Sequence, residues 1–271
     1  MSCETNSSRQ KAGVIGNPAN VWLRPAGISG TLYRLKPPRT KGSLSEKHMF
    51  IRLSHTLKRG GPAFGRVSNL ALEPTASIAQ GDTHHGFTMR IHNHDGTHMD
   101  APYHFNIEGK RIAELNLDEL IFDRPLIVDV PKSEASLITR SELESHADAI
   151  AKCDLLMLRT GYCRVRSSDP GKFSDRPPCL APEAARYIVE ACPSVKGVAI
   201  DSVSVGSPVF KAETVETHRI LTGCRGYGGR YVLIFEDVNM DFDFKTLKRV
   251  IVMPLFVEQI DGSPCTIIAE V

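Results

Sequence analysis

Short apolar runs alternate with helix-like segments from residue 49 onward. The runs are rich in Val, Ile and Leu: PLIVDV (125–130), DLLMLRTG (154–161), KGVAID (196–201), RYVLIFED (230–237) and RVIVMPLFVE (249–258). Their length and the turn residues beside them favour buried strands over helices. Because strands that alternate with helices are typical of α/β proteins, the pattern predicts one α/β domain over residues 49–271.

Two segments between these runs carry helix-start signals. Ser141 and Glu144 have the spacing of a capping box ahead of LESHADAIAK, which predicts a helix there. Pro182 occupies a suitable first helical position in APEAARYIVEAC, and Pro193 ends that segment. We therefore expect helices to begin at these residues and to flank the sheet.

The first 48 residues differ in composition from the rest of the chain. They hold eight Lys or Arg residues against Glu4 and Glu46, and prolines interrupt every apolar period. This composition predicts a basic, poorly ordered extension (1–48) in front of the domain (49–271). An organellar transit peptide is the alternative, because the segment is rich in Arg and Ser and poor in acids. The prolines weaken that alternative, since transit peptides need an amphipathic helix.

The composition of the whole chain excludes several classes of function. The net charge is +2, and 41% of the 271 residues are hydrophobic, as in ordinary globular proteins. Nothing in this balance points to nucleic acid, and no apolar stretch approaches the roughly 20 residues of a membrane helix. The seven cysteines are scattered without a CxxC pair, which favours a reducing compartment. We expect a cytoplasmic protein, or an organellar one if residues 1–48 are a transit peptide.

The segment HNHDGTHMDAPYHF (92–105) contains four of the ten histidines. Because His98, Asp100 and His104 follow His94 at even offsets, an extended strand would point all four side chains to one face. A straight strand would, however, separate the first and last by about 33 Å, at roughly 3.3 Å per residue. One metal ion, with bonds of about 2.0–2.1 Å, cannot gather groups that far apart. A metal site here therefore requires the segment to bend.

Gly96 and Pro102 are the residues that permit such a bend. Glycine accepts unusual dihedral angles, and proline prevents a regular helix or central strand from running through. Imidazoles together with a carboxylate suit Zn²⁺, Mn²⁺ or Fe²⁺, whereas Ca²⁺ and Mg²⁺ prefer oxygen ligands. Each histidine alone is explained as a solvated loop residue. Their joint spacing around an aspartate favours a metal site.

The same segment resembles the signature of a known family. Residues 94–105 are similar to the HxGTHxDxPxHF motif of the cyclase family, which includes bacterial kynurenine formamidases (arylformamidases) and isatin hydrolases. Further segments resemble other family motifs: IRLSHTLKRGGPAFG (51–65), LLMLRTGY (155–162), GVAIDSVSV (197–205), THRILTG (217–223) and LIFEDVNMD (233–241). The resemblance covers about residues 50–271. It implies a mixed, partly barrel-like β-sheet flanked by helices, and metal-dependent hydrolysis of an amide bond in a small molecule.

The resemblance also implies roles for single residues. Five residues match metal ligands of the family: His94, His98, Asp100, His218 and Glu236. His104 matches the residue that donates and accepts the proton, and Phe64 lies near an aromatic substrate contact. The family implies one or two divalent ions, Zn²⁺ or Mn²⁺, and a homodimer or homotetramer. Its substrates include N-formylkynurenine and isatin, which suggests tryptophan catabolism.

Two departures from the family pattern leave the number of ions open. Asp237 stands where the family usually has Asn, and a glycine-rich stretch, GCRGYGG (223–229), lies between His218 and Glu236. Because of these departures, a non-catalytic member that keeps the metal only for stability and acts as a binding module remains an alternative.

Two other enzyme classes match parts of the sequence. His92 and His94 form the HxH pattern of Fe²⁺-dependent cupins, and two histidines with a carboxylate form the ligand set of Fe²⁺ oxygenases. The glutamate that should follow shortly after is missing between residues 95 and 107. A serine hydrolase is disfavoured because the chain has no G-x-S-x-G elbow.

Overall fold

The computed structural model describes residues 22–23, 33–34, 49–243 and 246–271. The chain divides into two units, Met1–Lys47 and His48–Val271. In the first unit, β1 (Trp22–Leu23) pairs antiparallel with β2 (Tyr33–Arg34). The predicted character of the extension, residues 1–48, otherwise lies outside the described residues.

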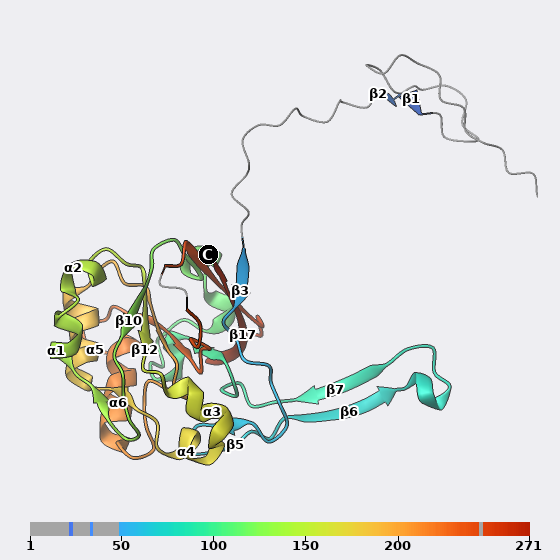
Figure 1. Ribbon diagram of the computed structural model, residues 1–271, viewed down its shortest axis with the longest axis horizontal. Helices are drawn as coiled ribbons and strands as arrows, with labels where there is room; N and C mark the ends of the chain where they lie inside the picture. The colour runs from blue at the N-terminus through green and yellow to red at the C-terminus, as the bar shows by residue number, and fades with distance from the viewer. Residues whose placement is uncertain (1–21, 24–32, 35–48, 244–245) are drawn as a thin grey trace, which may run out of the picture. The chain divides into compact units, whose positions relative to one another are not determined.

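The second unit is built on a nine-stranded mixed sheet (Figure 1). Its parallel half consists of β10 (Pro125–Asp129), β12 (Leu155–Arg159), β14 (Gly197–Ile200) and β15 (Leu233–Glu236). Its antiparallel half consists of β8 (His98–Asp100), β17 (Gly262–Glu270), β16 (Arg249–Pro254), β9 (Ile121–Phe122) and β3 (Phe50–Arg52). Five of these strands, β10, β12, β14, β15 and β16, confirm the strands predicted from the apolar runs.

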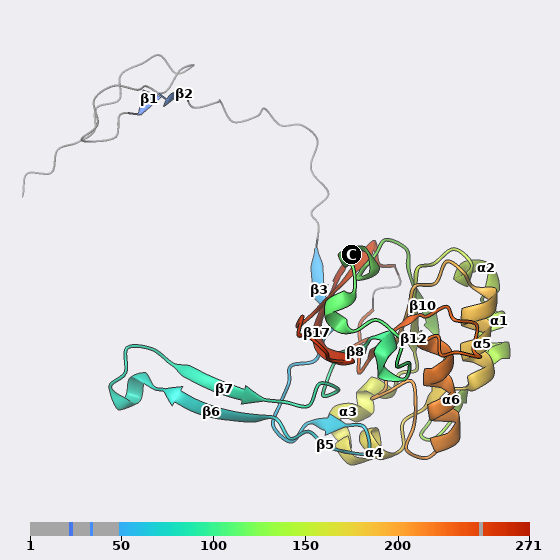
Figure 2. The same ribbon diagram turned by 180° about the vertical axis from the view of Figure 1, so that it is seen from behind.

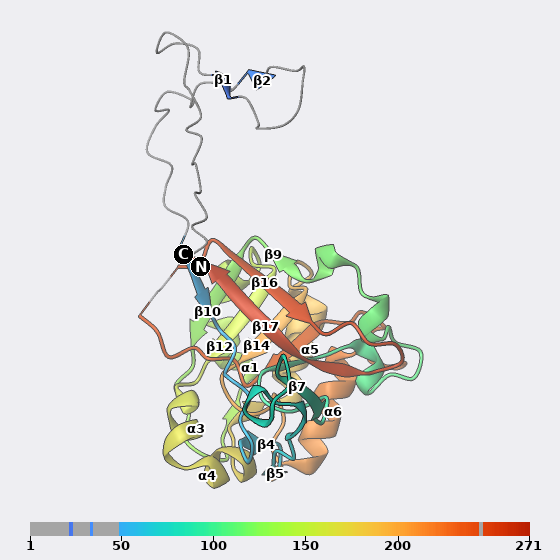
Figure 3. The same ribbon diagram turned by 90° about the vertical axis from the view of Figure 1, so that its right-hand side faces the viewer.

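Alternating side chains of the parallel strands serve two separate cores. On β12, Leu156 and Leu158 face the helices, whereas Leu155 and Met157 face the strands of the antiparallel half. The second core is enclosed by the curved sheet itself, with β16 and β17 on the side away from the helices (Figures 1 and 3). This arrangement confirms the predicted α/β domain with a mixed, partly barrel-like sheet.

Helices cover the outer face of the parallel strands (Figures 1 and 2). The α-helices are α1 (Arg140–Glu144), α2 (Ala147–Ile150), α3 (Val165–Ser168), α4 (Pro170–Asp175), α5 (Pro182–Ala191) and α6 (Lys211–Leu221). As predicted, Pro182 is the first residue of α5, and that helix ends before Pro193. None of the helices in the described part of the chain is long and apolar enough to span a membrane.

The predicted capping box at Ser141 and Glu144 is wrong by two positions. Helix α1 begins after Thr139, and both the backbone N–H and the hydroxyl of Thr139 donate to Glu142 Oε2 at 2.9 Å. The predicted helix is also divided into α1 and α2. Ser145 Oγ donates to the carbonyl of Glu142 at 2.6 Å, and such a side-chain bond competes with the next helical hydrogen bond.

Three two-stranded sheets and five 3₁₀ helices complete the unit. The sheets pair β4 (Pro62–Ala63) with β5 (Arg66–Val67), β6 (Ala71–Ala76) with β7 (Gly86–Arg90), and β11 (Leu137–Ile138) with β13 (Cys179–Leu180). The 3₁₀ helices are η1 (Ile78–Gln80), η2 (Pro102–His104), η3 (Ile112–Glu114), η4 (Leu117–Glu119) and η5 (Tyr162–Arg164). The β6–β7 hairpin extends away from the rest of the unit as a long arm (Figures 1 and 2).

Candidate metal centre

Strands β8 and β15 bring three polar side chains to one face of the sheet. Glu236 lies opposite His98 in the strand register, and Asp100 is two residues along β8 from His98. Because side chains alternate along a strand, these three share a face. Met99 and Phe235 point the other way, into the core. His98 Nε2 is 3.2 Å from Glu236 Oε2 and 3.6 Å from Asp100 Oδ1.

The segment before β8 bends at Gly96, as predicted. Gly96 has a φ of 67°, and a Cβ there would lie 2.4 Å from Leu57 Cδ2, so a side chain would be strained and would collide. The bend returns His94 toward the strand, with Nδ1 2.8 Å from Asp100 Oδ1.

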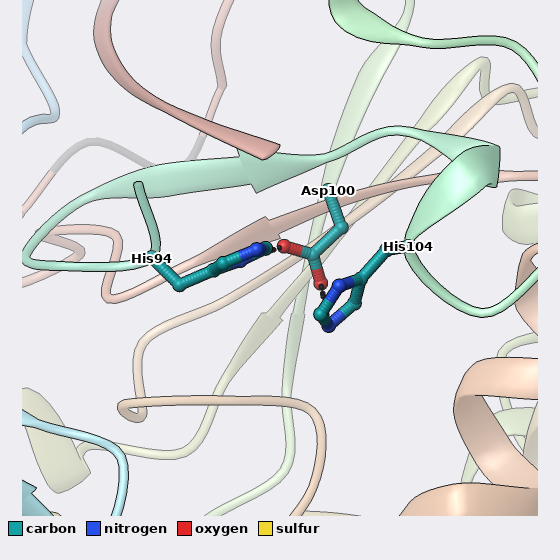
Figure 4. Close-up of side chains that lie close together, drawn as sticks. All are labelled: His94, Asp100 and His104. Atoms are coloured by element: carbon teal, nitrogen blue, oxygen red, sulfur yellow. Dashed lines mark hydrogen bonds and ion pairs between the residues drawn. The ribbon is translucent and has the colours of Figure 1, made fainter. Parts of the chain in front are cut away.

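Beyond β8, Pro102 begins helix η2, which carries His104 back to the same carboxylate. His104 Nε2 lies 4.0 Å from Asp100 Oδ2. Figure 4 shows His94 and His104 pointing at the two oxygens of Asp100. A three-residue strand between two bends therefore replaces the straight strand that could not gather these side chains.

Helix α6 supplies the remaining predicted residue. His218 Nε2 lies 3.6 Å from Glu236 Oε1 and 3.9 Å from Asp100 Oδ2. The structure thus brings together all six residues expected at the centre: His94, His98, Asp100, His104, His218 and Glu236.

Backbone carbonyls fix which nitrogen of two imidazoles faces inward. His98 Nδ1 lies 2.8 Å from the carbonyl oxygen of Gly96, and His218 Nδ1 lies 2.7 Å from that of Thr214. Since a carbonyl only accepts, both Nδ1 atoms carry the proton in the neutral rings. Their Nε2 lone pairs then face Asp100 and Glu236, which is the form in which imidazole binds a metal.

The two buried carboxylates have different hydrogen-bond environments. Glu236 Oε1 accepts from Ser204 Oγ at 2.8 Å and from the backbone N–H of Val205 at 2.7 Å. Burial acts to raise the pKa of Glu236, but His218 and His98 outweigh it and hold the pKa well below the usual range. Asp100 Oδ2 is buried and accepts no hydrogen bond. An orphaned carboxylate oxygen costs free energy unless a cation or another donor satisfies it.

The donor set fits a divalent metal ion. Two groups of side chains have donor atoms close enough to share an ion, namely His98 with Asp100 and Glu236, and His94 with Asp100 and His104. Asp100 belongs to both groups, and its unsatisfied Oδ2 faces the second. Imidazole and carboxylate donors are those that Zn²⁺ and Mn²⁺ accept.

A cavity of about 220 Å³ opens onto these residues. Phe64, Arg66 and Phe105 contribute to its lining, together with His92 and the inward-facing histidines. Phe64 therefore lines this cavity, and its contact with a substrate stays a prediction. Arg66 is held by the buried Asp95, with 2.6 Å between its Nη2 and Asp95 Oδ1. Residues of the glycine-rich stretch 223–229 are not among those that line the cavity.

Sequence reasoning missed Asp261, which lies just before β17. Its Oδ2 is 2.6 Å from His104 Nδ1 and 3.1 Å from His94 Nε2. The only local signal is the Asp-Gly pair that it forms with Gly262. A Cβ on Gly262 would lie 2.3 Å from Cε1 of His94, so the ring of His94 occupies the space that a side chain would fill.

The unusual Asp237 is accommodated by a buried ion pair. Arg166 donates to its carboxylate from Nε at 2.7 Å and from Nη2 at 2.8 Å. Burial raises the pKa of Asp237, although Arg166 opposes the shift. Thr97 Oγ1 donates to the carbonyl of Asp237 at 2.6 Å. This bond links Asp237 to the histidine-containing segment 92–105.

Comparison with known proteins now identifies the class, since residues 51–207 match the family model described as "Putative cyclase". The chain belongs to the cyclase family. A kynurenine formamidase of Bacillus cereus is 32% identical over 182 residues, which cover 65% of this chain and 75% of the relative. These matches confirm the predicted family.

Solved structures confirm the fold. Isatin hydrolase A from Ralstonia solanacearum superposes with a TM-score of 0.70 at 18% identity, covering 83% of this chain and 92% of that one. An isatin hydrolase bound to the product analogue thioisatinate gives the same TM-score at 16% identity, covering 83% and 93%.

Proposed function

We propose that the protein is a metal-dependent hydrolase of non-peptide amide bonds, with arylformamidase-like specificity. The observation that carries this proposal is the convergence on Asp100 of donors from four segments, around a carboxylate oxygen that is buried and has no hydrogen bond. Relatives named as kynurenine formamidases and structural neighbours named as isatin hydrolases support the reaction class.

The residues that would hold the metal are His94, His98, Asp100, His218 and Glu236, with one or two ions of Zn²⁺ or Mn²⁺. When bound, such an ion polarises the substrate carbonyl and makes a coordinated water acidic enough to ionise near neutral pH. The buried carboxylates compensate the positive charge, and the tautomers set by Gly96 and Thr214 leave lone pairs directed inward.

His104 would move the proton. Its Nε2 faces Asp100 without a direct hydrogen bond, at 4.0 Å, and so remains available to solvent and substrate. It takes a proton from the attacking water while oxygen bonds to the carbonyl carbon. It then returns the proton to the nitrogen as the C–N bond breaks, giving an acid and an amine. Phe64 and Phe105 in the cavity lining favour a small aromatic amide.

Metal analysis combined with a substrate screen tests the proposal. We expect purified protein to contain a divalent metal and to hydrolyse at least one of N-formylkynurenine, isatin and formanilide. Activity should disappear with a chelator and return with Zn²⁺ or Mn²⁺. Turnover that required oxygen would favour the Fe²⁺ oxygenase. Metal binding without hydrolysis of any of the three would favour the non-catalytic module.

The variant His104→Ala separates proton transfer from metal binding. We expect kcat to fall by about 10²–10⁴-fold while bound metal remains near the wild-type content. His146→Ala is a matched control because His146 is exposed and far along the chain from the centre. Loss of metal from His104→Ala would show that His104 is a ligand and would contradict its proposed role.

A further inference from the structure

Asp261 has a hydrogen-bond environment that nothing in its local sequence predicts. Its Oδ2 meets His104 Nδ1 at 2.6 Å and His94 Nε2 at 3.1 Å. Its Oδ1 accepts from the side-chain amide of Asn93 at 2.6 Å. One carboxylate is therefore held by three donors, and two of them belong to the candidate metal centre.

The backbone around Asp261 fixes the carboxylate in this position. The N–H of Ala101 donates to the carbonyl of Asp261 at 2.8 Å, and Gly262 pairs with Asp100 in the β8–β17 register. The absent side chain of Gly262 leaves room for the ring of His94 beside that pair. The location of Asp261 thus follows from strand pairing rather than from a flexible loop.

An ionised carboxylate accepts hydrogen bonds and donates none. The Oδ1 atom of Asp261 already accepts from the Asn93 amide, and its Oδ2 lies within hydrogen-bond distance of both imidazoles, so this carboxylate is placed to accept from each ring. In neutral rings, the proton must then sit on Nε2 of His94 and on Nδ1 of His104. That leaves His94 Nδ1 facing Asp100 Oδ1, at 2.8 Å, and His104 Nε2 facing Asp100 Oδ2.

We propose that Asp261 is a positioning residue that sets the tautomer and orientation of both His94 and His104. The inference rests on the proposed hydrolase function and deepens it. Through His94, Asp261 would strengthen metal binding, as carboxylates behind metal-bound imidazoles do. Through His104, it would present the lone pair of Nε2 to the reacting water. Asp261 itself is not among the residues that line the cavity, and it would act only through the two histidines.

The variant Asp261→Asn tests this assignment in the metal-loaded protein. The amide has nearly the same shape, but its NH₂ group donates and would favour the opposite tautomers. We expect the Zn²⁺ dissociation constant, measured by chelator competition, to rise about 10–100-fold. At saturating Zn²⁺ the metal content should equal that of the wild type. We expect kcat to fall by at least about 10²-fold with KM nearly unchanged, in line with loss of the carboxylate behind a catalytic histidine.

Two further variants keep the test specific. Asp118→Asn removes an exposed carboxylate elsewhere and should change neither metal affinity nor kcat. Asn93→Ala removes the bond to Asp261 Oδ1 at 2.6 Å and a longer one to the carbonyl of Gly262 at 3.3 Å, but leaves the Asp261 carboxylate in place, so a smaller loss of kcat, roughly 5-fold, is expected. If Asp261→Asn fails to fold, Asn93→Ala still decides, because wild-type kcat and metal affinity in that variant would overturn the inference.

The outcomes distinguish this inference from the function on which it rests. If the wild type hydrolyses no substrate, the proposed function fails, while the shift in Zn²⁺ affinity still tests Asp261. If the wild type is active and Asp261→Asn keeps both affinity and kcat, the positioning role is wrong and the hydrolase stands. If Asp261→Asn binds no Zn²⁺ even at saturation, Asp261 is a direct ligand and the inference is overturned.

Discussion

Asp237 illustrates how a single residue affects the surroundings of the candidate metal centre. It follows the predicted ligand Glu236, is 1% exposed, and has a φ of 52° in the left-handed region. Asp and Asn are the L residues that most readily adopt this conformation. An amide here would need no counter-ion, whereas the carboxylate requires Arg166. The two residues therefore form one unit.

Replacing Arg166 with Met should show how much the free energy of unfolding depends on the ion pair between Arg166 and Asp237. The variant leaves the Asp237 carboxylate buried with only His55 Nε2, 3.8 Å away, near it, so we expect a loss of up to about 3–5 kcal/mol of stability in urea unfolding. The double variant Arg166→Met with Asp237→Asn should recover most of the loss, because the remaining group is neutral. Equal stability of the single variant and the wild type would show that the ion pair does not compensate the buried charge.

Residue spacing predicted the histidine cluster but not its partners. His94, His98, Asp100 and His104 are close in sequence, so a local pattern revealed them. His218 and Glu236 were found only because their segments resemble family motifs. Asp261 lies 157 positions from His104, and strand pairing alone brings them together. No local period encodes such a contact.

At the scale of elements, the start of α1 shows that two possible capping boxes can overlap in one segment. Only one of them, formed by Thr139 and Glu142, caps the helix. Glu142 accepts from the Thr139 backbone at 2.9 Å and from Lys132 Nζ at 2.6 Å. Ser141 and Glu144 have the same spacing in sequence, but Glu144 pairs instead with Arg140. The pattern predicted the presence of a helix here, and tertiary contact with Lys132 selected its first residue.

The variant Glu142→Gln should weaken this cap in a pH-dependent manner. Burial acts to raise the pKa of Glu142, but Lys132 and Thr139 outweigh it and lower the pKa below 4.5. A carboxyl with a lowered folded-state pKa stabilises the protein above its unfolded value, and this contribution is lost as the pH falls through the folded value. We expect the variant to be about 0.5–1 kcal/mol less stable at pH 7. In thermal unfolding, the difference should shrink below pH 4.5; a constant difference would contradict the role of ionisation.

For the whole molecule, the most distinctive feature is the β6–β7 arm. An isolated two-stranded hairpin is only marginally stable in water, yet this arm exposes Ile78, Phe87 and Met89, each more than half exposed. We propose that a second copy of the chain covers the arm, in the homodimer or homotetramer implied by the family resemblance.

Light scattering during size-exclusion chromatography tests the assembly. We expect the wild type to be a dimer or tetramer. A variant in which residues 72–89 are replaced by Asn-Gly should shift toward monomer, because Ile78, Phe87 and Met89 are all removed while the Ala71–Arg90 pair can still be joined by a two-residue turn. That variant should retain its metal, since the arm supplies none of the predicted ligands. A monomeric wild type at micromolar concentration would contradict the proposal.

The apolar runs predicted the strands of the parallel half of the sheet. They did not predict β8, the strand that joins this half to the antiparallel half. Long Val- and Ile-rich runs identify β10, β12, β14 and β15 because both faces of these strands are buried. The three-residue strand β8 is too short for any period, and its residues are mostly polar. Its insertion between β15 and β17 depends on long-range pairing, which single-sequence patterns do not contain.

The short strand β8 joins the two halves of the sheet, and two of its three side chains are predicted ligands. Asp100 and Glu236 are both buried at this junction, and Asp100 Oδ2 accepts no hydrogen bond there, so a bound cation would compensate their charge. Chelation should therefore accelerate amide hydrogen exchange at residues 98–100 and 234–236 before it affects α5. A bound ion would then hold the two halves of the sheet together at β8. The supply of metal would therefore control the lifetime of the folded protein as well as its activity.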